Sequence, residues 1–116
     1  MVDSDPEPAP AIKRIELSRS PVTASDHLEI ITQLVEFRPG ATSPRHFHHG
    51  EETFFVLEGG TVQEPGRPPR ERVPGENGII PRGAHHSGYT VIGDRTITVF
   101  SVYVVEKGKP LQELVA

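Results

Sequence analysis

The sequence predicts an all-β domain, a small sandwich or barrel, on three observations. Gly and Pro supply 11 and 12 of the 116 residues, about a fifth of the chain against roughly 12% in average proteins. Such a density of turn residues favours short strands over helices. Runs of β-branched and aromatic residues recur between the turns, and no stretch of ten residues has a convincing helical pattern.

The expected strands each end at a Gly or Pro turn. The longest is the run at 95–105, and the others span 12–17, 28–37, 53–57, 61–63, 79–80 and 85–92. We expect a hairpin around Gly59-Gly60 and a polar loop over 64–78, which holds four prolines. Residues 110–114 have room for one helical turn.

The chain divides into a tail and one domain. Residues 1–11 are acidic and Pro-rich and lack apolar spacing, which predicts a flexible N-terminal arm. Residues 12–116 then form a single domain, because a chain of 12.7 kDa has room for one core. The strands at 53–57 and 97–105 are apolar on both faces, so both faces need cover. We expect a homodimer to supply the second layer.

Charge and cysteine content exclude several classes of protein. The net charge is -4, and no Lys/Arg run is present, which argues against a nucleic-acid or membrane-surface partner. No stretch approaches the roughly 18 apolar residues of a spanning helix. Without cysteine, any metal must be held by His, Asp or Glu. The N-terminus lacks the features of a secretory signal, so a cytoplasmic location is expected.

Five of the six histidines fall in two tight groups. His46 and His48 lie two apart, which on a strand directs both imidazoles to one face. Glu52 lies at an even offset from them, and His86 arrives from a separate strand. Three imidazoles and one carboxylate suit one divalent Fe, Mn, Ni, Co or Zn ion and leave positions open for a substrate. His85 has the opposite strand parity and is expected to point away, unless a bulge lets it replace His86.

The spacing of these residues resembles the two sequence motifs of the cupin family. Gly40, His46, His48, Glu52 and Gly59 read G(X)5HXH(X)3E(X)6G. The second motif, G(X)5PXG(X)2H, is matched by Gly75, Pro81, Gly83 and His86. The family's usual Asn four residues after the last histidine is Thr90 here, a supporting position outside the ligand set.

The resemblance implies a small single-domain cupin, similar to the quercetinase-like members. It implies a jelly-roll β-barrel, often dimeric, with a metal held by His46, His48, Glu52 and His86. Gly40 and Gly59 would bracket a hairpin carrying three of these ligands, and the turn at Pro81–Gly83 would deliver the fourth.

Two classes of function follow from this site. The first is a mononuclear metal-dependent oxygenase of the dioxygenase type that acts on a small organic substrate, with Glu52 as ligand or catalytic base. A lyase, decarboxylase or isomerase could use the same ligands without redox chemistry. The second class is a non-catalytic module that binds a small ligand or metal.

For several residues near the candidate ligands, the sequence allows either a functional or a purely structural role. The hydroxyls of Tyr89 and Tyr103 are candidates to lie near the metal, although a buried tyrosine is commonly part of the core. Arg45 and Arg82 flank the ligand-bearing turns and are candidates to bind an anionic substrate, or they are solvated loop residues. His49 and Glu51 are expected at the surface or an interface.

Overall fold

The structure, a computed structural model, describes residues 11–115 and contains eleven strands in that range. The strands are β1 (Ile12–Pro21), β2 (Leu28–Phe37), β3 (Thr42–Ser43), β4 (His46–Phe47), β5 (Gly50–Glu58), β6 (Gly60–Gln63), β7 (Arg70–Arg72), β8 (Asn77–Ile80), β9 (Tyr89–Ile92), β10 (Ile97–Glu106) and β11 (Glu113–Leu114). The described part of the chain has no helix of the length and apolarity needed to cross a membrane. The predicted arm lies outside the described residues, apart from Ala11.

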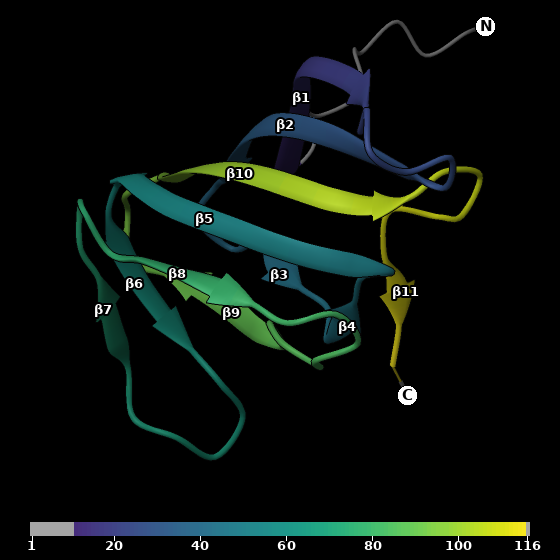
Figure 1. Ribbon diagram of the computed structural model, residues 1–116. Coiled ribbons are helices and arrows are strands. Elements are labelled where there is room, and N and C mark those ends of the chain that lie inside the picture. Colours follow the sequence, from purple (N-terminus) through teal and green to yellow (C-terminus); the bar gives the residue numbers. More distant parts are fainter. Residues whose placement is uncertain (1–10, 116) are drawn as a thin grey trace, which may run out of the picture.

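The strands form two antiparallel sheets that face each other as a jelly roll (Figure 1). The larger sheet has the order β1-β2-β10-β5-β8, and the smaller has the order β3-β9-β6-β7. A short pair, β4 with β11, lies at one end of the barrel (Figure 1). Strands β2 and β10 pair along ten residues each, from Ile97↔Phe37 to Glu106↔Leu28. The predicted all-β jelly-roll fold is confirmed.

The core fills the space between the two sheets in two clusters. The larger cluster combines inward residues of both sheets: Val35, Phe37, Ala41, Val56, Val62, Tyr89, Val91, Ile97 and Val99. The smaller one holds Ile31, Tyr103 and Val105, with Leu111 packed against it. Between the clusters the inward positions of β2 and β10 are polar, since the buried Gln33 and Ser101 lie opposite each other there. The series of inward apolar residues along β2 and β10 is therefore interrupted by polar residues at this one pair of positions.

The hairpin predicted around Gly59-Gly60 is wrong. Strand β5 belongs to the larger sheet and β6 to the smaller one, so the glycine pair is where the chain crosses between sheets. A Cβ on Gly59 would lie 2.1 Å from the carbonyl oxygen of Arg72. Only a residue without a side chain fits at position 59. The close approach at this crossing therefore explains Gly59 without a hairpin turn.

Three other segments differ from the sequence prediction. The polar segment 64–78, expected to be a loop, contains the strand β7 (Arg70–Arg72), which pairs with β6 at the edge of the smaller sheet. Prolines flank β7, and they are tolerated there because an edge strand has one side without backbone hydrogen bonds. Residues 113–114 form β11 and pair with β4 instead of making a helical turn. The strand expected at 85–92 begins only at Tyr89, because Ser87 and Gly88 have φ angles of 68° and 83° that interrupt it.

The outward side of the larger sheet carries an apolar surface on strands β2, β10, β5 and β8. Phe55 pairs with Phe100 across β5 and β10, and Ile79 with Thr53 across β8 and β5. Phe55, Leu57 and Ile79 are 44%, 46% and 72% exposed. A contiguous apolar sheet face of this kind is typical of a protein–protein contact.

We propose that this outer face joins two copies of the chain in a homodimer, and Phe55→Glu is predicted to break it. The substitution would bury a carboxylate without a partner, which is far costlier than losing one aromatic contact. Light scattering at micromolar concentration should give a dimer mass for the wild type and a monomer mass for the variant. Val73→Glu alters an equally exposed apolar residue beside β7 and should leave the dimer intact. A wild-type monomer mass would contradict the proposal.

Candidate metal centre

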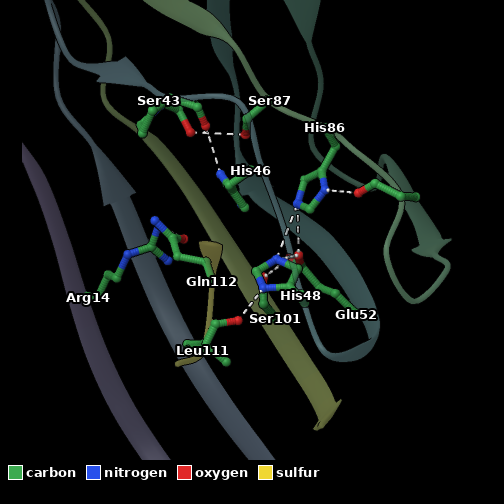
Figure 2. Close-up of polar contacts among 12 residues, drawn as sticks. Arg14, Ser43, His46, His48, Glu52, His86, Ser87, Ser101, Leu111 and Gln112 are labelled. Atoms are coloured by element: carbon green, nitrogen blue, oxygen red, sulfur yellow. Dashed lines mark hydrogen bonds and ion pairs between the residues drawn. The ribbon is translucent and has the colours of Figure 1, made fainter. Parts of the chain in front are cut away.

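Figure 2 shows His46, His48, Glu52 and His86 next to one another, in the region where β4, β5 and the segment before β9 meet. His46 comes from β4, His48 from the connection between β4 and β5, and Glu52 from the inward face of β5. His86 precedes β9 and forms a β-bridge with His46. His46, His48 and Glu52 are buried, and His86 is half-buried. The three histidines present nitrogens that all lie within 4.8 Å of one another.

Each imidazole is oriented by a hydrogen bond from its Nδ1 atom to a backbone carbonyl oxygen. The partners are Pro44 for His46 at 2.7 Å, Leu111 for His48 at 2.7 Å and Ala84 for His86 at 3.0 Å. A carbonyl oxygen only accepts, so each Nδ1 carries the hydrogen and each neutral ring keeps its Nε2 lone pair free. This is the arrangement that orients histidine for a metal.

The free nitrogens of two rings face each other and a carboxylate. The Nε2 atoms of His48 and His86 are 3.2 Å apart, and they lie 2.9 Å and 3.5 Å from Oε1 of Glu52. Lone pairs and a carboxylate oxygen at these distances repel unless a cation lies among them. A proton or a metal ion satisfies that requirement, so the residues fit a divalent ion with nitrogen and oxygen ligands.

Glu52 is held as a carboxylate despite its burial. Burial would raise its pKa, but hydrogen bonds with His48 and His86 outweigh burial and lower the pKa of Glu52 to about 2. Ser101 Oγ donates a further hydrogen bond to Oε2 at 2.9 Å. The carboxylate is therefore ionised over the whole physiological range and available as a ligand.

The histidines differ in their affinity for protons. Burial lowers the pKa of His46 to about 4, so this imidazole is neutral at pH 7. Burial would also lower the pKa of His86, but its hydrogen bond to Glu52 reverses the effect and raises the pKa above 6.5. Its hydrogen bond to Glu52 therefore favours a proton on His86 more than on a free imidazole.

The turn before β9 brings His86, and not its neighbour His85, into the histidine cluster. Gly83 has a φ of 76°, a conformation that favours glycine, and Ser87 adopts a φ of 68° just after the ligand. Ser43 Oγ donates a hydrogen bond to Ser87 Oγ at 2.9 Å, which supports that strained backbone. His85 is exposed, stacks on Phe47 and lines the cavity beside the site, and it is not among the three histidines whose nitrogens converge.

A cavity of 380 Å³ opens beside the four residues, large enough for a small organic molecule. His46, His86 and Glu52 form part of its wall, with aromatic residues that include Phe54 and Tyr103. The Tyr103 ring packs edge-on against His48 at 5.0 Å between centroids. Burial, and then the nearby Glu52 charge, raise the pKa of Tyr103 to about 12, so its hydroxyl keeps its proton.

The other sequence candidates lie in different environments. Tyr89 is in the core beside Phe37, and its hydroxyl accepts a long hydrogen bond from Arg72 at 3.4 Å. Arg82 is paired with Glu106, whereas Arg45 lines the cavity. His49 forms an ion pair with Glu113, and Glu51 is exposed.

Sequence reasoning missed three contributors to the site. Ser101 and the Leu111 carbonyl are brought to Glu52 and His48 by pairing between distant segments. Arg14 lines the cavity from β1. Its offset of two from the inward Ile12 was a usable signal, because positions two apart on a strand share a face.

The chain belongs to the cupin family, since residues 33–103 match the Cupin domain. Comparison with curated proteins finds no match. Among solved structures, the chain is similar to the DMSP lyase DddQ from Ruegeria pomeroyi DSS-3, with 27% identity and a TM-score of 0.56 over 78% of this chain and 44% of that one. The chain thus spans less than half of that lyase.

Two further structures share the fold. The polyketide cyclase RemF from Streptomyces resistomycificus has 29% identity and a TM-score of 0.60, over 91% of this chain and 72% of that one. A salicylate 1,2-dioxygenase from Pseudaminobacter salicylatoxidans has 19% identity and a TM-score of 0.54, over 82% and 26% of the two chains. At 19% identity, the likeness to the dioxygenase concerns the fold alone.

We predict that His48→Ala reduces the bound metal to near zero. The variant removes one nitrogen ligand and leaves Glu52 without its shortest histidine contact. Elemental analysis of the purified protein measures the metal content, with circular dichroism as a check that the barrel is folded. His85→Ala is the matched control and should keep the wild-type content. A full equivalent of metal in His48→Ala would contradict the ligand assignment.

We predict that metal affinity falls as the pH drops through the pKa of His86, beginning above pH 6.5. A proton on Nε2 must leave before that nitrogen can bind a cation, so protons and metal compete. His46, with a pKa of about 4, adds nothing to the competition near neutrality. Calorimetric titration with Zn²⁺ between about pH 5 and 8 should therefore show fewer than three protons released per ion. An affinity independent of pH would contradict the prediction.

Proposed function

We propose that the protein is a mononuclear metal-dependent enzyme acting on a small organic molecule. His46, His48, His86 and Glu52 would hold one divalent Fe, Mn, Ni, Co or Zn ion. The observation that carries the proposal is the position of these four residues. Three of them, His46, Glu52 and His86, form part of the wall of a 380 Å³ cavity, so a substrate inside it would lie against these ligands.

Each group of residues around the site would have a separate role in the reaction. The ion, when bound, would supply Lewis-acid activation and, for a redox-active metal, electron transfer. The backbone carbonyls of Pro44, Leu111 and Ala84 keep the imidazoles oriented. The Tyr103 hydroxyl retains its proton and is available to donate a hydrogen bond to a substrate oxygen. Phe54 and the other aromatic residues exclude water from the apolar part of the substrate.

Glu52 is proposed first as a ligand. Its low pKa of about 2 makes it a weak base while its hydrogen bonds persist. To accept a substrate proton, the carboxylate would have to give up its contacts with His48 and His86, which would raise its pKa. Ser101 remains within 2.9 Å as a partner during such a movement.

We favour a redox-neutral reaction, a lyase or cyclase type of chemistry, over oxygenation. The support is that two similar structures with more than 25% identity are described as a DMSP lyase and a polyketide cyclase. The dioxygenase reaction is the second candidate, because the donor set of three imidazoles and one carboxylate also suits a metal that binds dioxygen.

Turnover in air and under argon separates these candidates. The metal-loaded protein would be incubated with DMSP and with a panel of diketones, flavonols and catechols. Product formation under argon supports the redox-neutral reaction, and turnover that needs dioxygen uptake supports the oxygenase. Metal binding without turnover of any panel member favours the non-catalytic alternative.

We predict that Glu52→Gln lowers turnover by roughly 100-fold, the usual scale for losing an acid–base group or an ionised ligand. The amide is nearly isosteric and leaves Ser101 with an acceptor, so the fold should be retained. Glu51→Gln is the matched control, because Glu51 is the exposed neighbour on the opposite face of β5. Unchanged kcat in Glu52→Gln would exclude a role for this carboxylate in the reaction.

A further inference from the structure

The cavity beside the histidines has a charge opposite to that of the whole chain. The net charge of the protein is -4. Four arginines and three glutamates line the cavity: Arg14, Arg45, Arg70, Arg72, Glu52, Glu64 and Glu76. Whether this excess of arginine leaves positive charge in the cavity depends on which arginines are paired with carboxylates.

All three glutamates of the lining are already paired. Glu52 contacts His48 at 2.9 Å, Glu76 contacts Arg72 at 2.9 Å, and Glu64 contacts Arg67 at 3.6 Å. Arg14, Arg45 and Arg70 have no carboxylate partner among residues 11–115. The cavity thus offers guanidinium groups whose charge nothing in the described chain neutralises.

Arg14 and Arg45 line the cavity together with His46, Glu52 and His86 of the candidate metal centre. Arg14 pairs with the inward Val35 in the β1–β2 register and reaches over β2 toward Gln112, to which it donates a hydrogen bond at 3.2 Å (Figure 2). This partner is a neutral amide, so the charge stays available. Arg45 directly precedes His46 and packs beside Gly88, at the rim next to the His86 turn. The two arginines therefore reach the cavity from β1 and from the connection between β3 and β4.

We propose that the cavity binds a small organic carboxylate, with the guanidinium groups of Arg14 and Arg45 holding the acid group and the aromatic wall holding its apolar part. This inference rests on the proposed function, because it names the substrate class of the same site. Phe54 and Tyr103 supply the apolar contacts on the inner side. Guanidinium is suited to this role because its planar donors match the two oxygens of a carboxylate.

The chemistry also predicts which molecules are rejected. A neutral amide of the same shape lacks the charge and places an N–H donor against the arginine donors. Because both guanidiniums lie at a partly exposed rim, solvent screens them, and about a tenfold preference for the acid over the amide is expected. Charge, rather than size, should decide binding.

The test compares benzoate with benzamide on the full-length chain by calorimetric titration. The titration is run with the metal-loaded protein and repeated after EDTA treatment. Arg14→Gln and Arg45→Gln should each weaken benzoate binding about tenfold and leave benzamide unchanged. Arg19→Gln and Arg82→Gln are matched controls, since these arginines are engaged by glutamates outside the cavity. Both controls should retain the wild-type affinity.

The outcomes separate this proposal from the proposed function. Benzoate binding that depends on both arginines in the EDTA-treated protein supports the carboxylate site even if no turnover is found. Benzoate binding that survives both arginine substitutions but is lost in His48→Ala overturns it, and leaves the metal-dependent enzyme intact. Equal affinity for benzamide and benzoate, or no benzoate binding at millimolar concentration, also overturns it.

Discussion

The hydrogen bonds from three imidazole Nδ1 atoms to backbone carbonyls are the interactions on which the site depends. They assign the hydrogen to Nδ1, leave each neutral Nε2 as an acceptor and direct the rings toward one another. The carbonyls lie in the connections between strands, and the rings cannot turn away without losing these part-buried hydrogen bonds. The contact between Nε2 of His48 and the Glu52 carboxylate at 2.9 Å then requires a cation. The backbone therefore enforces an arrangement that the side chains alone would avoid.

The barrel accommodates this polar cluster by dividing its core. Along β10 the inward residues are Ile97, Val99, Ser101, Tyr103 and Val105. The single serine in that series donates to Glu52, and apolar clusters lie on both sides of it. Packing on either side keeps water out, which strengthens the electrostatic contacts of the buried carboxylate. The same burial makes His46 a neutral ligand at physiological pH.

Paired and unpaired charges have separate roles in the cavity. Arg72 pairs with Glu76 at 2.9 Å and lies over the Phe54 ring, so its charge on the cavity wall is neutralised. The guanidiniums of Arg14 and Arg45 have no such partner in the described chain, and they provide a positive field that an acidic protein would otherwise lack. A cavity built in this way selects ligands by charge first and by shape second.

The residues of the candidate metal centre were predictable because their signals are local. Strand parity relates His46 to His48, and the two motif spacings add Glu52 and His86, so the four could be chosen from the sequence. The all-β fold likewise follows from turn residues and β-branched runs. The Gly59-Gly60 signal was misread, since a glycine pair marks a tight approach of backbones whether the chain reverses or crosses between sheets. The carbonyl that orients His48 lies 63 residues away, and Arg14 reaches the cavity from the edge strand of the larger sheet. Strand parity could have placed Arg14 on the inward face of β1, but which distant segments meet at the cavity depends on long-range contacts that no local pattern of residues encodes.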